Sequence, residues 1–420
     1  MIIIKPSLLV GREFFYFFLL AFFTLLLALF FEYYHYLKLT QFEDAVIEVE
    51  VLKHYRKNND NKNYEVLKLQ TEAGAKFYIT SKVPLKDLVG YRVKIWILTK
   101  HFTFLEYLKG FATKGSVISV SRSRDKRYQL GEELSEVHQN LSVSQLYGAL
   151  FFALPLSAQL QERFSMLGVS HLLAISGFHL GVLSFILFTF LRFPYKLLQN
   201  HFFPYRHRNR DLFVMVALML GTYLLFLGDV ASLLRAYAML LVGYVLHDRG
   251  LKIISMQTLL ITLVILIVIW PRLFFSMGFW LSIGGVYAIF LYLHYFSGQA
   301  KYVSFIALPV WVYLLMTPVS LVLFGNYSLY HPLSIVWSLL FTLFYPLVLF
   351  LHTIAYGNSL DIFIEPFLTS ELSGEYFELS IFWLVPYLLL ALGSLYSKWV
   401  LYLLFFLAFG VSVAAVYQVA

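Results

Sequence analysis

The stretch FFYFFLLAFFTLLLALFF at residues 14–31 decides the fold class, because it contains no charged side chain. An α-helix rises about 1.5 Å per residue and needs about 20 mainly apolar residues to cross roughly 30 Å of hydrocarbon. The rest of the chain has the same character, with 60% hydrophobic and only 13% charged residues. Soluble domains carry about a quarter charged residues. The sequence therefore predicts a polytopic α-helical membrane protein.

Apolar segments of similar length continue this pattern after residue 170. Together with residues 14–31 they predict about ten transmembrane helices. The segment VSQLYGALFFALPLSAQL at 143–160 is interrupted at Pro155, which predicts a re-entrant or interfacial helix instead of a full span. The expected later spans are 171–192, 212–228, 231–247, 255–270, 274–296, 303–324, 333–352, 380–396 and 399–417.

The segment from Glu43 to Arg127 differs from the rest, because it has 17 Lys and Arg against 10 Asp and Glu. Its apolar residues alternate with polar ones, as in half-buried strands. Five such strands predict an inserted small β-barrel of the OB-like type, although a small β-sandwich would give a similar pattern. The expected strands are 45–52, 64–70, 75–80, 91–98 and 115–121.

Cations and aromatic rings share faces of two expected strands, since side chains alternate along a strand. Cations neutralise phosphates and rings stack on bases, so such a face suits single-stranded nucleic acid. The same alternation is typical of an ordinary solvated strand face. The candidate contacts are Arg92, Lys94 and Trp96 on 91–98, and Lys76 and Tyr78 on 75–80.

The N-terminal span is expected to be an uncleaved anchor, because small cleavage-site residues do not follow it. Lys5 and Arg12 precede it, and positively charged flanks stay in the cytoplasm. This places the N-terminus in the cytoplasm and the β domain on the extracytoplasmic side. The basic loop after 171–192 agrees with this orientation, whereas the acidic loop 357–378 leaves its own side open.

Several motifs together resemble the ComEC family of competence DNA-internalisation proteins. The segment HLLAISGFHLGV at 171–182 resembles the signature of that family. The further matching stretches, in chain order, are FLEYLKGFATKGSVISV (104–120), FLGDVASLLRAYAML (226–240), MGFWLSIGGVYAIFLY (277–292) and FGNYSLYHPLSIVWSLLF (324–341).

The resemblance implies an inner-membrane channel that passes single-stranded DNA into the cytoplasm during natural transformation. The implied partners are single-stranded DNA, the lipid bilayer, a periplasmic DNA receptor and a cytoplasmic translocase or single-strand-binding proteins, with the oligomeric state left open. Many family members continue into a metallo-β-lactamase-like domain, but no His-x-His-x-Asp-His cluster occurs here. We therefore expect a truncated form that is not an enzyme and needs no cofactor or metal.

The implied organisation has five parts: an N-terminal transmembrane anchor (1–42), an extracytoplasmic OB-like β domain (43–127), a linker with the interfacial or re-entrant helix (128–165), a competence-type channel core (166–355), and a loop with a C-terminal transmembrane hairpin (356–420). A transporter of another anionic substrate, or a membrane scaffold with a basic binding domain, also fits the composition.

Polar residues in the signature segment are candidates for the DNA path. In one continuous helix His171 and His179 lie about 80° apart around the axis, and Ser176 joins them in a polar stripe. Such a stripe faces protein or water, so it either lines a pore or packs against neighbouring helices. The spacing lacks the i, i+4 geometry of a helical zinc site. Gly177 and Gly181 flank the second histidine and complete this group.

Three polar residues elsewhere are further candidates for the DNA path. Arg235 lies a few residues inside an expected span and either contacts phosphate, reaches the membrane interface or pairs with Asp229. Asn326 and His331 lie in an expected external turn. They either line the mouth of the path or cap a helix.

Overall fold

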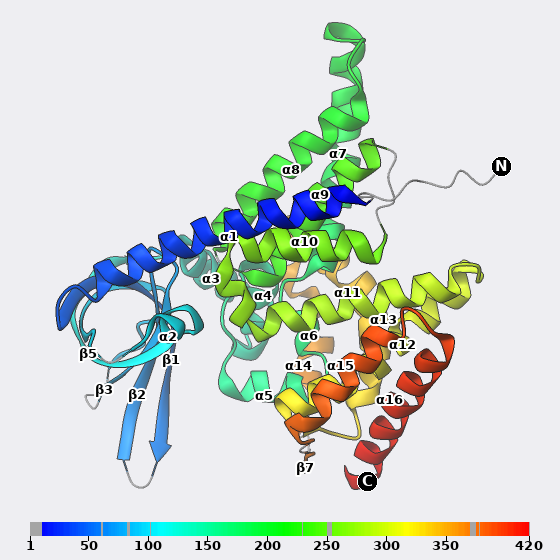
Figure 1. The fold of residues 1–420 in the computed structure, drawn as a ribbon. Helices are drawn as coiled ribbons and strands as arrows, with labels where there is room; N and C mark the ends of the chain where they lie inside the picture. Colours follow the sequence, from blue (N-terminus) through cyan, green and yellow to red (C-terminus); the bar gives the residue numbers. More distant parts are fainter. Residues whose placement is uncertain are drawn as a thin grey trace.

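The computed structural model describes residues 11–59, 62–81, 85–100, 102–228, 230–249, 254–369, 375–377 and 379–419. A small closed barrel lies beside a larger body of helices (Figure 1). Helix α1 (Arg12–Leu39) runs from the helical body to the barrel and packs along α10 (Met256–Ile269). Lys5 and Asp229, which entered the predictions above, lie outside the described residues.

The barrel contains five strands in the order β1-β2-β3-β5-β4, and the pairing of β1 with β4 closes it. Neighbouring strands are antiparallel except β3 and β5, which are parallel. The closed barrel confirms the expected small barrel, is compatible with the OB-like type, and excludes the β-sandwich alternative. The strands are β1 (Asp44–Asn59), β2 (Lys62–Thr71), β3 (Lys76–Ser81), β4 (Tyr91–Leu98) and β5 (Phe111–Arg124).

Alternating apolar side chains fill this barrel, among them Val93, Ile95 and Ile97 of β4. A short helix, α2 (Phe104–Lys109), adds Tyr107 to the same core. The helix begins at a capping box in which the Thr103 backbone N–H donates to a carboxylate oxygen of Glu106. The sequence did not predict this helix.

Strand β1 is longer than expected because it contains a β-bulge. The pairing with β2 shifts between Val51 and Lys53. Val49 and Val51 are buried before the shift, whereas Lys53 after it is exposed and the neighbouring His54 side chain turns inward. An extra residue reverses the alternation of inward and outward side chains, so a pattern search ends the strand there.

The membrane helices follow the expected order. Seven helical segments in the described residues are long and apolar enough to cross a membrane. They are α1, α6–α7 (Ser170–Leu173 and Gly177–Phe202), α8 (Arg208–Leu227), α11 (Met277–Phe296), α12 (Lys301–Phe324), η2–α13 (His331–Leu333 and Ser334–Thr353) and α16 (Lys398–Val419). The count of about ten is not confirmed, since α10 and α15 (Leu384–Gly393) are shorter and α9 (Ala231–Asp248) is not among these segments.

The remaining elements connect these helices. The expected interruption at Pro155 is present, because α4 ends at Phe152, the following Ala153 is left-handed with φ 54°, and α5 begins only at Ala158. The bounds are α3 (Lys126–Val137), α4 (Leu141–Phe152), α5 (Ala158–Met166), α14 (Asp361–Thr369), η1 (Pro271–Phe275), η3 (Gly357–Leu360), η4 (Ile381–Trp383), β6 (Asn326–Tyr327) and β7 (Glu375–Tyr376).

The prediction of one continuous helix over 171–192 is wrong. The short α6 ends at Leu173, Ala174 and Ser176 adopt extended backbone conformations, and α7 begins at Gly177. His171 and His179 therefore lie on different helices, and their calculated separation around one axis does not apply.

Two arginines attach the barrel to the helices. Arg127 donates to Glu50 of β1 at 2.9 Å and to the Leu227 carbonyl at the end of α8 at 2.6 Å. Arg272 of η1 donates to Glu32 of α1 at 2.6 Å and to the Tyr107 hydroxyl at 2.9 Å. Hydrogen bonds to charged groups contribute about 1.5–3 kcal/mol each, so these links hold the barrel in one orientation.

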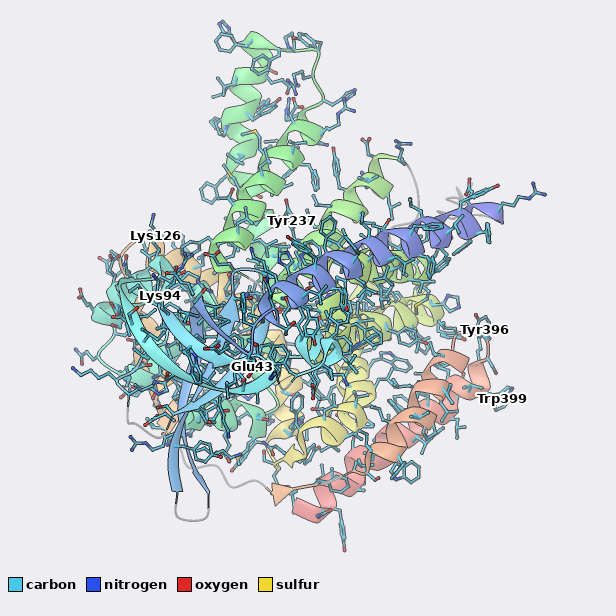
Figure 2. The ribbon with its side chains drawn as sticks, turned by 60° about the vertical axis from the view of Figure 1, so that its left-hand side comes forward. Glu43, Lys94, Lys126, Tyr237, Tyr396 and Trp399 are labelled. Carbon is cyan, nitrogen blue, oxygen red and sulfur yellow. The ribbon has the colours of Figure 1, made fainter. Side chains whose placement is uncertain are left out.

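The C-terminal helices lie on the far side of the molecule from the barrel. Tyr396 and Trp399, near the turn between α15 and α16, are highly exposed and lie opposite Lys94 of the barrel (Figure 2). Exposed Tyr and Trp near the ends of apolar helices are typical of the membrane interface.

Candidate nucleic-acid interface

A cleft of about 940 Å³ lies between the barrel and helices α3 to α5. Strands β1 to β3 provide one wall of this first cleft, with the side chains of Lys53, Tyr55, Arg56, Lys68 and Tyr78. Residues of α3, α4 and the α4–α5 connection provide the opposite wall, among them Glu132, Ser144, Gln145 and Pro155. The barrel thus presents cations and rings toward the helices.

A second cleft of about 470 Å³ continues from the first, because Lys53, Lys68, Tyr128 and Pro155 line both. It extends along β1, β2 and β4 to Leu227, Gly228 and Val230, where α8 gives way to α9. The two clefts together connect the barrel surface to the beginning of α9.

Three side chains form a row across the sheet where the clefts meet. Lys53 of β1 pairs directly with Lys68 of β2, and Lys68 pairs directly with Tyr78 of β3. The Lys68 ammonium lies 5.4 Å from the centre of the Tyr78 ring. Like charges directly opposite each other destabilise a sheet, and a cation above a ring is attracted to it. We call Lys53, Lys68 and Tyr78 the cation–tyrosine row.

The row carries positive charge that no carboxylate of the described residues neutralises. Neither Lys53 nor Lys68 forms an ion pair with a carboxylate in the described part of the chain. Desolvation in the cleft and the neighbouring charge of Lys68 lower the pKa of Lys53. An anion in the cleft would relieve both effects.

The charge of the clefts is uneven. The first has three cations, Lys53, Arg56 and Lys68, against three carboxylates, Glu65, Asp87 and Glu132. The second has five cations, Lys53, Lys68, Lys76, Arg92 and Arg127, against three carboxylates, Glu48, Glu50 and Glu72. The excess positive charge therefore increases from the first cleft toward the start of α9.

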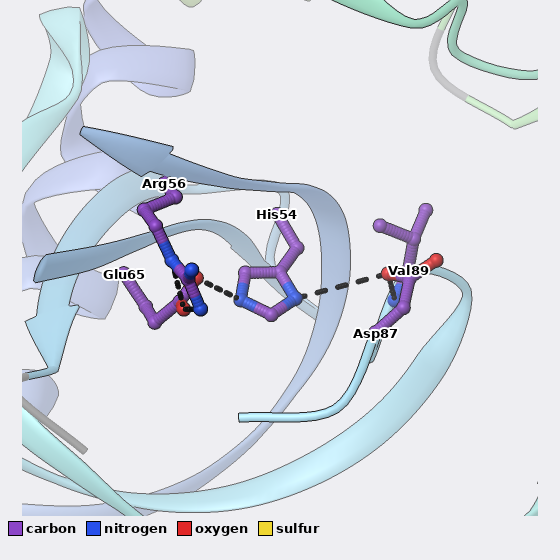
Figure 3. A network of polar contacts seen from close by, with 5 residues as sticks. All are labelled: His54, Arg56, Glu65, Asp87 and Val89. Atoms are coloured by element: carbon purple, nitrogen blue, oxygen red, sulfur yellow. Dashed lines mark hydrogen bonds and ion pairs between the residues drawn. The ribbon is translucent and has the colours of Figure 1, made fainter. Parts of the chain in front are cut away.

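An ion network around the buried His54 and Glu65 forms part of the wall of the first cleft (Figure 3). Arg56 donates two hydrogen bonds to Glu65, at 3.0 and 2.9 Å, and His54 contacts the other carboxylate oxygen at 3.0 Å. The hydrogen bonds from Arg56 hold the pKa of Glu65 below its usual value. Because Arg56 is paired with Glu65, Lys53 and Lys68 are the cations of this cleft wall that can bind an anionic ligand.

The predicted barrel residues divide between the clefts and the opposite surface. Tyr78 lines the first cleft, and Lys76 and Arg92 line the second. Lys94 and Trp96 line neither: Lys94 lies directly opposite Glu48, and the Trp96 indole donates to Asp44 at 2.6 Å. Strand β1 thus places acids beside the cations of β4, which the sequence of β4 alone does not show.

The structure places His179 at the start of α7 and fully buries it. Its Nδ1 accepts from the Ser176 backbone N–H at 3.2 Å, which is a capping contact, and the Tyr345 ring lies 4.4 Å away. Its Nε2 has no hydrogen-bond partner in the described structure. Gly177 and Gly181 are exposed, and the exposed His171 contacts the Ser338 hydroxyl at 3.2 Å.

Arg235 is buried in the first half of α9, and its Nε and Nη1 have no partner among the described residues. The helix break at 174–176 lies beside this part of α9, since the Ser232 hydroxyl donates to the Ile175 carbonyl at 2.6 Å. A side chain at Gly177 would approach Ala236 to 3.5 Å. Residues 175–177 therefore pack against the first half of α9.

Asn326 and His331 lie together near the end of α12. His331 is buried, stacks on Tyr327 at 4.7 Å and contacts the Tyr313 hydroxyl at 3.3 Å. Asn326 pairs through its backbone with Tyr376 of β7. Within the described residues, none of the eight candidates in the helical body lines either cleft: His171, Ser176, Gly177, His179, Gly181, Arg235, Asn326 and His331.

Lys53, Tyr55 and Lys68 are among the cleft residues that the sequence did not indicate. Their common face depends on strand register and on the bulge in β1, which a single strand does not reveal. A search for lysines opposite each other in paired strands would have found Lys53 and Lys68 once the register was known.

A family model described as Competence protein matches residues 155–420, which is more than half of the chain. The barrel lies before the matched region. Searches of curated proteins and of solved structures found no match.

Proposed function

The chain belongs to the competence protein family, and we propose that it passes single-stranded DNA across the bacterial inner membrane during natural transformation. The family supports a role in DNA uptake. The observation that carries the finer statement is the cation–tyrosine row, which places two lysines without a described carboxylate partner and a ring in a cleft between the barrel and helices α3 to α5.

The row suits a single strand because it offers cations for the phosphates and an aromatic ring for the bases. Lysines neutralise backbone phosphates and release counterions, and a tyrosine stacks on a base of any sequence. The second cleft then leads toward α9 with an increasing excess of cations. A strand held by the row would meet this positive gradient before it reaches buried Arg235.

In this proposal the N-terminus is cytoplasmic and the barrel is extracytoplasmic, so the barrel receives DNA from a periplasmic receptor. A cytoplasmic translocase or single-strand-binding proteins take up the emerging strand. The chain itself acts as a channel without nuclease activity, since its sequence has no cysteine and no clustered His and Asp motif for a metal-activated water.

A complementation experiment tests the proposal. A transformable strain that lacks its own family member receives the full chain or the Lys53→Glu, Lys68→Glu double variant, and labelled DNA is followed into the periplasm and the cytoplasm. We expect the full chain to restore cytoplasmic DNA and the variant to leave DNA in the periplasm. Equal cytoplasmic uptake at equal protein level would contradict the proposed role of the cleft. Uptake that never depends on the chain would favour another anionic substrate.

A further inference from the structure

Two histidines and an aspartate from three separate elements meet where the end of α3, the end of α13 and the start of α14 come together. His138 caps the C-terminus of α3, His352 lies in the last turn of α13, and Asp361 is the first residue of α14. The His138 Nδ1 lies 2.8 Å from an Asp361 carboxylate oxygen, and its Nε2 lies 3.3 Å from the His352 Nε2. The His352 Nδ1 lies 2.8 Å from the Val348 carbonyl.

These three contacts need three protons. A carbonyl oxygen only accepts, so the His352 Nδ1 carries a hydrogen, and the contact between His138 and Asp361 needs one hydrogen as well. The two Nε2 atoms need a third hydrogen between them, because two bare lone pairs at this distance repel each other. Two neutral histidines and a carboxylate supply only two hydrogens.

We propose that His138, His352 and Asp361 form a binding site for one additional proton, which the two imidazoles share. With this proton the cluster is neutral overall, as an imidazolium, a neutral imidazole and a carboxylate. Without it the cluster has a net negative charge and an unmade contact in a buried place. A buried site of low polarity favours the neutral arrangement.

The surroundings support a positive charge on the imidazoles and a negative charge on the aspartate. Helix C-termini favour cations and helix N-termini favour anions, and each of the three residues lies at the matching end of its helix. The His138 side chain is fully buried, and the Tyr147 ring stacks on it at 4.6 Å. The Tyr147 ring also meets His352 edge to face at 4.7 Å.

Few other titratable groups face the cluster. Tyr147 comes from α4, and its buried hydroxyl has no partner in the described part of the protein. Glu365, one turn after Asp361 on α14, accepts from the Asn140 amide at 2.6 Å. No group of three or more His, Asp or Glu residues suited to a metal ion occurs in the described chain, so we assign the site to a proton and not to a metal.

The proton connects the membrane helix α13 to a wall of the first cleft. Helices α3 and α4 line this cleft with Glu132, Ser135, Ser144 and Gln145. The same two helices reach the cluster, because His138 caps α3 and Tyr147 of α4 stacks on His138. Loss of the proton removes the contact between α3 and α13. This coupling to the cleft rests on the proposed function, whereas the proton site stands without it.

Nitrogen NMR of the wild-type full chain, labelled only at histidine, tests the proton directly. At about pH 8 an exposed histidine has lost its additional proton, since its ordinary pKa is near 6.5. We expect one imidazolium signal to persist there and to disappear in the Asp361→Asn variant. A spectrum without a persistent imidazolium signal would overturn the proposal. Zinc added at an equimolar ratio provides a second check: if it bound wild type but neither His138→Gln nor His352→Gln, the cluster would be a metal site and the proposal would be wrong.

Thermal unfolding against pH provides the second measurement. The stabilisation by the shared proton should be present at low pH and lost as the pH rises through the titration of the folded cluster. The unfolding temperature of wild type should therefore fall with pH more steeply than that of His352→Gln. The exposed His201→Gln serves as the matched control and should follow wild type. A pH profile of His352→Gln parallel to that of wild type would refute the site, whatever the outcome of DNA uptake.

The effect on the cleft has its own test, because the chain contains no cysteine that would interfere with labelling. Spin labels at Leu141→Cys on α4 and Phe350→Cys on α13, both exposed, report the distance between the α3–α4 pair and α13. The distance should increase as the pH rises, and it should no longer depend on pH in His352→Gln. A distance independent of pH in wild type would contradict the coupling.

Discussion

Lys53 and Lys68 lie directly opposite each other on paired strands and face the same cleft. A like-charged pair in this position lowers the stability of the sheet, so the pair is not explained by folding. The pair also has no carboxylate partner in the described residues, whereas Arg56 pairs with Glu65 and Arg127 pairs with Glu50 and Asp125. Such cations beside a ring fit the proposed single-stranded DNA ligand.

Replacing both lysines should separate binding from folding. In Lys53→Gln, Lys68→Gln we expect weaker binding of a single-stranded oligonucleotide and a salt dependence shallower by about 0.7 per lysine. The unfolding temperature should stay equal or rise, because the repulsion is gone. Fluorescence anisotropy at several salt concentrations measures both quantities on the full chain. Lys114→Gln, an exposed lysine outside both clefts, is the control, and equal loss in that variant would contradict a specific role.

Tyr78 should contribute through its ring and not through its hydroxyl. Tyr78→Ala should reduce DNA affinity by about 1–3 kcal/mol, the value of one base stacked on an aromatic side chain. Tyr78→Phe keeps the ring and should bind almost as well as wild type. Titration with homopolymer oligonucleotides measures this difference. If the Phe variant lost as much affinity as the Ala variant, stacking would not be the mechanism.

DNA affinity should depend on pH through Lys53. Desolvation and Lys68 lower the pKa of Lys53, and a bound phosphate favours its charged form. Affinity should therefore fall as the pH rises through this lowered pKa, before ordinary lysines lose their charge. Lys53→Arg should hold its affinity, since a guanidinium stays charged. Identical pH profiles of wild type and Lys53→Arg would show that Lys53 does not titrate in this way.

His179 should act on helix α7 through its capping contact. His179→Leu removes the acceptor of the Ser176 backbone N–H and should destabilise the protein by about 0.5–2 kcal/mol, with less protein in the membrane. His179→Gln provides a side-chain oxygen at the same position of a capping box and should restore the protein level. Membrane abundance and DNA uptake are measured together. A Gln variant at normal abundance that has lost uptake would instead place the ring in the DNA path.

The membrane helices and the barrel could be predicted because both depend on patterns within single segments. Uninterrupted apolar runs indicate spans, and the alternation in YRVKIWIL at 91–98 matches β4 residue for residue. The capping helix α2 and the break at 174–176 were missed, since both depend on a few polar side chains in otherwise apolar surroundings. The Ser176-x-x-His179 spacing was the available signal for the break, because it imitates a capping box.

The candidate site was harder to predict, since it depends on contacts between segments. Lys94 and Trp96 are candidates on the evidence of their own strand alone. In the fold, Lys94 lies opposite Glu48 of β1, and the Trp96 indole donates to Asp44. His138 and Asp361 lie more than two hundred residues apart and meet only in the fold. Neither spacing nor composition carries such information.

The bulge next to Leu52 determines which chemistry the barrel shows to the outside. The extra residue, Leu52, reverses the alternation of inward and outward side chains, so Lys53 and Tyr55 face outward where an uninterrupted strand of the same sequence would turn them into the apolar interior. Deleting Leu52 would join Val51 to Lys53 in regular alternation and leave both side chains facing outward. A relative with the same cations that accommodated the extra residue within a regular strand would keep the composition of this domain and lose these side chains from its surface.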